Sequence, residues 1–458
     1  MFCACPNCYG SEPNTNVCPV CMGYPGVLPV PNKEAIRKTV IAGLLTNCTI
    51  AKYSKFDRKS YFYPDMPKNY QISQYDLPFC ANGYIAIGGT GFSGEPMAEK
   101  KIGITRIHLE EDVAKLTHFH GASGVDYNRA GVPLMETVSE PDMRSADEAY
   151  AYLTSLKEIF VYGGIGDCDQ EKGQMRCDVN ISLRPEGQKE FGTKVELKNL
   201  NSFRAVHRAI DYEIWRQSEV LSSGGTIRQE TRGWNDDTGE TYLMRTKEQA
   251  HDYRYFPDPD LAPVVLSDEF IADLRANLPE LPGKMRERFV EQYALTPYDA
   301  EVLTQDKEIA SYFETAAKYV KTPKTLANWI ISELLRELDS SGLASCKVNA
   351  ENLGGLIALI ESGTINGKIA KEVFAEMLES GESAKAIVDA KGLAQVSDTG
   401  AIAKIVADAI AANPKQVQQY LDGNEKVLMY LVGQVMKLSK GKANPPMVIQ
   451  LLKEQLGK

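Results

Sequence analysis

The chain has 458 residues, enough for about three domains, and its 43% apolar and 24% charged residues are typical of a globular protein rather than a disordered or fibrous one. No run of about 18 apolar residues occurs, and the first ten residues lack the basic and apolar regions of a secretory signal. We therefore expect a cytoplasmic protein with no membrane partner. The net charge of −10 argues against nonspecific coating of nucleic acid by the whole chain, and we expect no DNA partner.

The first 21 residues hold five of the ten cysteines, which in a reducing compartment indicates a metal site rather than disulfides. Two sets of four thiolates are possible as the metal ligands. One set pairs Cys5 and Cys8 with Cys18 and Cys21 as two C-x-x-C knuckles, and the other set takes Cys3 in place of Cys8. Either set could surround a zinc ion tetrahedrally.

The chain up to about residue 280 is rich in turns and alternating apolar residues, which predicts strands with a few helices. We expect strands over four β-branched or alternating segments: 84–87, 102–109, 177–183 and 194–200. Ser145 opens a capping box, which predicts a helix running towards Tyr162. A second helix is expected over residues 203–222.

Gly89 to Gly94 matches the G-x-G-x-x-G pattern of dinucleotide-binding folds. Those folds need a helix directly after the motif, whereas Glu95, Pro96 and another predicted strand follow here. The motif therefore indicates a flexible turn, and the sequence contains no Walker A motif.

After residue 283 helical periodicity continues almost without a break. We divide the chain into a strand-rich part over 1–283, a helical domain over 284–398 and a helical tail over 399–458. Three helices are expected in the tail, separated by Asn-Pro pairs. From residue 401 onward eight lysines stand against four acidic residues, a net charge of +4, which suggests contact with an anionic partner.

The acidic residues of the predicted strands are the main candidates for chemistry. Period-two alternation points these polar residues outward: Arg106, His108 and Glu110 in one strand, Arg176 and Asp178 in a second, and Lys194, Glu196 and Lys198 in its partner. Carboxylates with interleaved cations suit Mg²⁺ and phosphate groups. The same pattern is typical of a sheet with a solvated, charge-paired face, so both interpretations stay open.

An aromatic segment runs from His251 to Phe256 and carries one strong cation, Arg254. It could stack on a nucleotide base, or it could pin the edge of a domain. The residues by themselves leave two further classes of function open: a noncatalytic zinc-containing RNA-binding protein and a metal-dependent hydrolase.

Long segments of the chain resemble the B subunits of the aspartyl/glutamyl-tRNA amidotransferases. They run in order and nearly end to end: EPNTNVCPVCMGYPGVLPV, SKFDRKSYFYPDMPKNYQISQYDLP, HLEEDVAKLTH, VDYNRAGVPLMETVSEPDMRS, MRCDVNISLRP, KVELKNLNSFRAV, HDYRYFPDPDL and GKIAKEVFAEM. The resemblance implies an α+β fold, in which a kinase-like cradle of antiparallel strands precedes an all-helical domain and a small helical tail that binds tRNA.

The resemblance also implies an ATP-dependent carbon–nitrogen ligase. Family members use ATP and Mg²⁺ to phosphorylate the side-chain carboxylate of misacylated Glu-tRNA(Gln) or Asp-tRNA(Asn). Ammonia from a glutaminase partner, the A subunit, then displaces phosphate and gives Gln-tRNA(Gln) or Asn-tRNA(Asn), and a small third partner, the C subunit, completes the heterotrimer. The alternative within this family is a noncatalytic tRNA-binding subunit that contains structural zinc.

Residue by residue, the family's H-x-E-E-D, R-C-D and E-x-K-N runs assign the catalytic roles to His108, Glu110, Glu111, Asp178 and Glu196. The implied magnesium ligands are Glu110, Asp178 and Glu196, and the implied phosphate or tRNA contacts are Arg176, Lys198 and Arg254. The implied zinc ligands are Cys3, Cys5, Cys18 and Cys21, because Cys8 is extra relative to the usual family pattern.

Besides the extra Cys8, the sequence departs from the family pattern at its start. Family members begin with a strand carrying Gly-Leu-Glu-Val-His a short distance before the first cysteine, whereas this sequence begins Met1-Phe2-Cys3. The Glu and His of that strand contribute to the family's metal site. We therefore expect the upstream reading frame to encode that strand.

Overall fold

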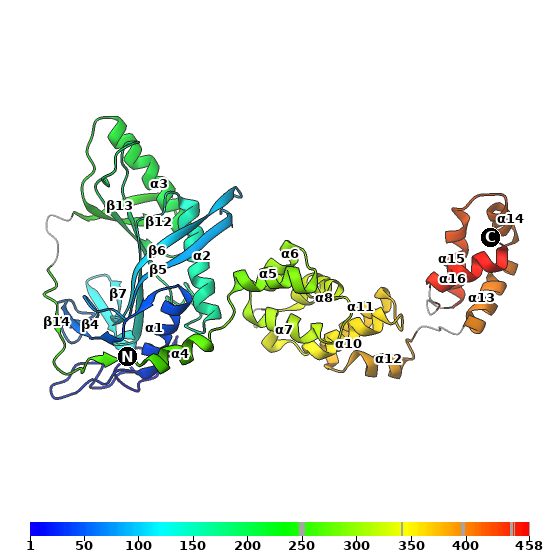
Figure 1. Cartoon of the computed structure of the whole chain (residues 1–458), viewed down its shortest axis with the longest axis horizontal. Helices are drawn as coiled ribbons and strands as arrows, with labels where there is room; N and C mark the ends of the chain where they lie inside the picture. The colour runs from blue at the N-terminus through cyan, green and yellow to red at the C-terminus, as the bar shows by residue number, and fades with distance from the viewer. Residues whose placement is uncertain (247–251, 340–341, 395–398, 440–442, 444, 458) are drawn as a thin grey trace. The chain divides into compact units, whose positions relative to one another are not determined.

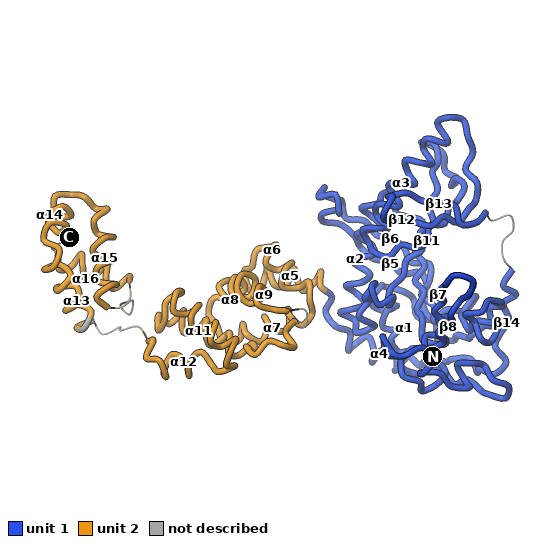
Figure 2. Tube along the Cα trace, turned by 180° about the vertical axis from the view of Figure 1, so that it is seen from behind, with its two compact units in different colours: residues 1–281 blue, residues 282–458 orange. Residues whose placement is uncertain are grey.

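The computed structural model describes residues 1–246, 252–339, 342–394, 399–439, 443 and 445–457. They form two compact units, Met1–Leu281 and Pro282–Lys458 (Figure 2). The three-part division stays a prediction, since its second boundary falls at residues 395–398, outside the described ranges. Within those ranges no helix is both long and apolar enough to cross a bilayer.

Unit 1 combines helices with mainly antiparallel sheets (Figure 1), which agrees with the predicted α+β class. The main sheet has the order β1 (Thr49–Ile50), β5 (Cys80–Thr90), β6 (Pro96–Glu111) and β9 (Pro133–Ser139). The second sheet has the order β10 (Cys177–Ile181), β11 (Val195–Leu200), β12 (Glu230–Asn235) and β13 (Glu240–Thr246), with only β11 and β12 parallel. All four predicted strand segments are confirmed.

Three small sheets complete the strands of unit 1. They are β14 (Phe256–Pro257) with β3 (Asp57–Ser60) and β4 (Tyr70–Ser73), β15 (Val264–Val265) with β2 (Tyr53–Ser54), and β7 (Lys115–Phe119) with β8 (Ala122–Asp126). The strand β3 lies between β14 and β4, so it joins two segments that are nearly 200 residues apart in the chain.

The helices of unit 1 begin at polar caps. They are α1 (Lys33–Leu45), the 3-10 turn η1 (Tyr127–Arg129), α2 (Ala146–Tyr162), α3 (Phe203–Ser222) and α4 (Asp268–Ala276). The Ser145 hydroxyl accepts a hydrogen bond from the backbone N–H of Glu148, and Ser202 caps α3 in the same way. Both predicted helices are therefore confirmed.

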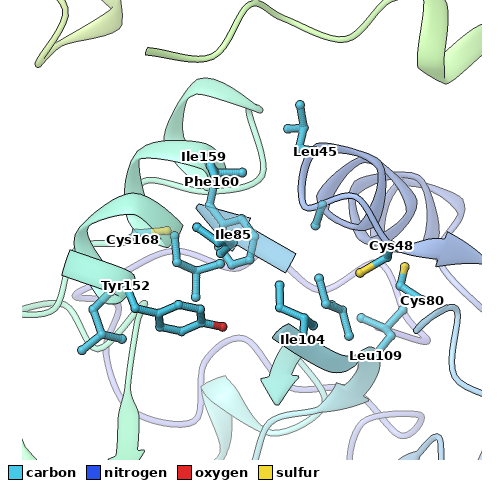
Figure 3. Close-up of a cluster of buried hydrophobic side chains, with 14 of the residues drawn as sticks. Leu45, Cys48, Cys80, Ile85, Ile104, Leu109, Tyr152, Ile159, Phe160 and Cys168 are labelled. Carbon is cyan, nitrogen blue, oxygen red and sulfur yellow. The ribbon is translucent and has the colours of Figure 1, made fainter. Parts of the chain in front are cut away.

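The core of unit 1 forms where α1 and α2 pack against β5 and β6. Figure 3 shows Leu45 of α1 and Phe160 of α2 with Ile85 and Ile104 from the two strands. Tyr152 of α2 also points into this core, and its buried hydroxyl has no hydrogen-bond partner among the residues that the structure describes. A buried polar group without a partner lowers stability.

The Gly-rich motif forms the tip of the β5–β6 hairpin, as the turn interpretation predicts. The tip is held in place, because the Ser93 backbone N–H and hydroxyl donate to the Asp147 carboxylate at 3.0 and 2.8 Å. Phe92 packs on Tyr150, with 4.9 Å between the ring centroids. A Cβ on Gly91 would come within 2.8 Å of the Asp147 carboxylate, so a larger residue here would force the Asp147 side chain to move.

Unit 2 is helical, as predicted. Its elements are α5 (Pro282–Tyr293), α6 (Pro297–Leu303), α7 (Lys307–Ala317), α8 (Pro323–Trp329), η2 (Ile330–Leu334), α9 (Leu335–Glu337), η3 (Gly342–Ser345), α10 (Ala350–Glu361), α11 (Gly367–Ser380), α12 (Ala384–Lys391), α13 (Thr399–Ala412), α14 (Pro414–Leu421), α15 (Val427–Leu438) and α16 (Pro445–Leu456). The last four replace the three predicted tail helices, which is a correction. Gly423, with φ of +104°, follows α14, so this stretch cannot continue as one helix.

We expect Tyr152→Phe to raise the free energy of unfolding by about 1 kcal/mol, because the substitution removes the unpartnered hydroxyl and keeps the ring. Urea titration followed by circular dichroism measures the change. Tyr127→Phe is the control, because the Tyr127 hydroxyl donates to the Pro64 carbonyl at 2.7 Å and its loss should not stabilise the protein. A destabilised Tyr152→Phe variant would contradict the assignment of an unpartnered hydroxyl.

Candidate functional site

Three side chains that can ligate a metal meet where β6 pairs with β9. His108 and Glu110 lie on β6, and the antiparallel register places Glu136 of β9 directly opposite His108. One ligand atom from each of the three residues lies within 4.8 Å of the others. We call His108, Glu110 and Glu136 the donor group; its imidazole and two carboxylates suit a divalent cation.

Glu110 is almost fully buried yet is held in its charged form. The Ser73 hydroxyl donates to its Oε2 at 2.8 Å, and the Lys59 Nζ lies 4.0 Å from the same oxygen. Burial acts to raise the pKa of Glu110, but the hydrogen bond from His108 and the charge of Lys59 hold that pKa below its ordinary value. A carboxylate is therefore present near neutral pH, as a metal ligand must be.

The next two acidic residues, Glu111 at the end of β6 and Asp112 directly after it, face other partners. Glu111, which is 1% exposed, accepts from the Lys68 Nζ at 2.7 Å and from the Ile72 backbone N–H at 2.8 Å. Asp112 accepts two hydrogen bonds of 2.8 Å from Arg176. The predicted site residues Glu111 and Arg176 thus belong to ion pairs beside the donor group.

A second polar group lies on the sheet of β10 and β11. The Lys198 Nζ is 2.5 Å from Asp178 Oδ2 and 3.5 Å from Glu196 Oε1, so both carboxylates face one cation. The Thr231 hydroxyl of β12 donates to Glu196 Oε2 at 2.8 Å. Burial acts to lower the pKa of Lys198, but the two carboxylates raise it, so Lys198 is charged at neutral pH.

The predicted magnesium ligands lie on two sheets. Asp178 and Glu196 share Lys198, as the strand pairing predicts. Glu110 belongs to a different sheet, and among the described residues it groups with His108 and Glu136 instead. Glu136 is not among the predicted site residues, although its run Leu-Met-Glu-Thr-Val-Ser alternates like a strand.

Arg254 is exposed, and its backbone N–H donates to the Asp252 carboxylate at 2.9 Å. It lies just before β14, in a segment that also holds Tyr253 and Tyr255. His251, named with this aromatic segment, lies outside the described residues.

The N-terminal cysteines form one group of four thiols: Cys3, Cys5, Cys18 and Cys21, with one sulfur of each within 4.8 Å of the others. Cys8 is exposed and is not in this group. Although burial acts to raise the pKa of Cys18, hydrogen bonds from the backbone of Cys21, the thiol of Cys5 and the backbone of Val20 lower it to about 7. The arrangement could hold a tetrahedral metal ion.

We expect Lys68→Met to lower the free energy of unfolding by about 3–5 kcal/mol, because it leaves the Glu111 carboxylate buried without its cation. Chemical denaturation measures the change. Arg37→Met is the matched control, since it removes the exposed pair with Glu34 and should change stability by at most about 1 kcal/mol. Equal effects of the two substitutions would contradict the importance of the buried pair.

Comparison with known proteins places the chain in one family. Residues 1–272 match the GatB/GatE catalytic domain, and residues 311–456 match the GatB domain. The aspartyl/glutamyl-tRNA(Asn/Gln) amidotransferase B subunits of Carboxydothermus hydrogenoformans and Thermoanaerobacter pseudethanolicus are 54% and 53% identical; the alignments cover 100% of this chain and 95% and 96% of those proteins. The one from Persephonella marina is 53% identical over 99% of this chain and 95% of its own length. The chain therefore belongs to the family of aspartyl/glutamyl-tRNA(Asn/Gln) amidotransferase B subunits.

Proposed function

We propose that this chain activates the side-chain carboxylate of misacylated Glu-tRNA(Gln) or Asp-tRNA(Asn) with ATP. A carboxylate is a poor acyl donor, because its oxygen is a poor leaving group. In the proposed reaction the carboxylate oxygen attacks the γ-phosphorus and ADP leaves; ammonia then attacks the acyl carbon and phosphate leaves. The products are the amide, ADP and phosphate, so the reaction belongs to the carbon–nitrogen ligases.

The proposal rests mainly on the donor group on β6 and β9. Its ligand atoms converge within 4.8 Å, and Glu110 is ionised despite its burial. A divalent cation such as Mg²⁺ at these residues would offset the negative charge of the phosphates and the substrate. The Ser73 hydroxyl and the Lys59 Nζ both approach Oε2 of Glu110, and these contacts help to orient the carboxylate.

The second polar group, formed by Asp178, Glu196 and Lys198, suits binding of the nucleotide phosphates. Lys198 is charged, and Asp178 and Glu196 hold it in place. A fixed cation beside two carboxylates can hold a phosphate group directly or through a second divalent ion. We assign Asp178, Glu196 and Lys198 to nucleotide phosphates, and the exposed Arg254 to phosphate or the tRNA end.

The proposed partners follow from the relatives and from the charge of the tail. The relatives are named as one subunit of an amidotransferase, and we propose that a glutaminase, the A subunit, supplies ammonia and that a small C subunit joins the assembly. The net charge of +4 from residue 401 onward suits the phosphate backbone of tRNA. Binding through the tail should accordingly weaken as the salt concentration rises.

The test uses the assembled subunits with the glutaminase site inactivated. It measures amide formation from Glu-tRNA(Gln), ATP and free ammonia. We expect Glu110→Gln and Glu136→Gln each to lower kcat/KM on the order of 100-fold, because each removes a ligand of a cation that supplies several kcal/mol. Glu99→Gln is the control, since Glu99 is exposed on the same strand β6 and lies outside the donor group.

Two results would contradict the proposal. An intact complex that binds the tRNA but forms no amide would indicate a noncatalytic tRNA-binding subunit. Hydrolysis of RNA without ATP would indicate a metal-dependent hydrolase.

We also propose that Cys3, Cys5, Cys18 and Cys21 hold a structural zinc ion. Four converging sulfurs fit the tetrahedral preference of zinc, and four protein ligands leave no open position for catalysis. The ion would tie the start of the chain to residues 18–21 and so order the loop between them.

We expect about one zinc ion per chain by atomic spectroscopy of the purified protein. Cys21→Ser should lose the metal and lower the melting temperature. Cys8→Ser is the matched control, because Cys8 is a neighbouring cysteine outside the group of four and its loss should leave the zinc content unchanged. Loss of zinc from Cys8→Ser but not from Cys21→Ser would overturn the ligand set.

A further inference from the structure

Three tyrosines form an aromatic cluster in unit 1: Tyr75, which follows β4, and Tyr253 and Tyr255, which precede β14. The rings of Tyr75 and Tyr255 stack with 4.5 Å between centroids and 13° between planes, and Tyr253 meets Tyr255 edge-on at 6.1 Å. Tyr75 is 62% exposed. Since Tyr255 covers one face of the Tyr75 ring, the exposed surface of Tyr75 offers a flat aromatic face to a ligand.

The tyrosine cluster is anchored on β3 from both sides. The Tyr75 backbone N–H donates to the buried Asp57 carboxylate at 3.1 Å, and the Ser60 backbone N–H donates to the Tyr253 carbonyl at 2.9 Å. The strand pairing of Phe256 with Arg58 fixes the segment that follows Tyr255. The rings are therefore preorganised, which lowers the entropy lost when a ligand stacks on them.

The tyrosine cluster and the donor group are neighbours. The Lys59 Nζ lies 4.0 Å from Glu110 Oε2 and 5.0 Å from the centre of the Tyr253 ring, so one lysine contacts both. Burial, followed by the charges of Glu110 and Glu136, raises the pKa of Tyr255. Tyr255 therefore lies within the electrostatic reach of the donor group.

We propose that the tyrosine cluster is a stacking site for the unpaired terminal base of a tRNA acceptor end. This inference rests on the proposed function. The reacting carboxylate is joined through its amino acid ester to the terminal nucleoside, so only a few covalent bonds separate the two. When the carboxylate reaches the donor group, the terminal base must lie close beside it, and the tyrosine cluster occupies such a position.

The chemistry of the cluster fits this ligand. Unpaired bases are recognised by stacking on aromatic side chains, which contributes about 1–3 kcal/mol per base. Lys59 adds a cation beside the rings, which suits the adjoining phosphate. The adenine of ATP shares the stacking chemistry, so the experiment must separate the two substrates.

The assembled complex is tested with Glu-tRNA(Gln) whose terminal base is replaced by 2-aminopurine, a fluorescent base that is quenched on stacking. We expect quenching with the unsubstituted complex and with Tyr75→Phe, which keeps the ring. Tyr75→Ala should lose the quenching and raise the KM for Glu-tRNA roughly tenfold or more, with the KM for ATP unchanged. Tyr53→Ala is the control, since Tyr53 is also about half exposed and lies on β2 of another small sheet.

Two results would overturn the inference. Quenching that persists in Tyr75→Ala would mean that the terminal base stacks elsewhere. If Tyr75→Ala raises the KM for ATP and not the KM for Glu-tRNA, the tyrosine cluster binds the adenine of ATP instead. A complex that quenches 2-aminopurine through Tyr75 but forms no amide would support this inference while contradicting the proposed function, so the two failures are distinguishable.

Discussion

Three consecutive acidic side chains, Glu110, Glu111 and Asp112, are buried where β6 ends, and several segments of unit 1 supply the groups that neutralise them. A buried carboxylate is strongly unfavourable unless cations or hydrogen-bond donors surround it. Glu110 has Ser73, His108 and Lys59; Glu111 has Lys68 and the Ile72 backbone; Asp112 has Arg176 and Arg129. Apart from His108 on β6 itself, the partners come from β3, β4, the loop before β4, η1 and the segment before β10, so one short stretch of chain contacts distant parts of the sequence.

Glu110 differs from Glu111 and Asp112 in the partners that it has. Glu111 and Asp112 have strong cations at hydrogen-bond distance, so they are structural anchors. Glu110 has a cation only at 4.0 Å, and its direct neighbours are a hydroxyl and an imidazole. This difference explains why we assign the ion to Glu110 with Glu136 and not to its neighbour Glu111.

The strand β3 links the donor group to the tyrosine cluster. It pairs with β4 on one side and β14 on the other, and it carries Lys59 between the donor group and the tyrosine cluster. Asp57 and Ser60 at its two ends hold the backbone of Tyr75 and Tyr253. A rigid strand thus positions an aromatic surface beside the carboxylates, which is the geometry that an aminoacylated nucleoside requires.

The sequence by itself determined the elements and several local contacts. The alternation of 177–183 and 194–200 predicted two paired strands with Asp178, Glu196 and Lys198 on one face, because residues two apart on a strand share a face. The cap at Ser145 predicted where α2 begins, and the cysteine spacing narrowed the thiols to two sets of four. The Gly423 break between α14 and α15 was missed, since apolar periodicity continues on both sides of it.

Only the tertiary structure decided which elements lie side by side. The sequence placed Glu110 with Asp178 and Glu196 on one open surface, whereas the structure divides them between two sheets and brings Glu136 opposite His108. It also places the Cys3 sulfur within 4.8 Å of those of Cys5, Cys18 and Cys21, and it stacks Tyr75 on Tyr255 across 180 residues of chain. Periodicity fixes the face on which a side chain lies, but the partner of that face depends on strand order and register, which distant packing sets.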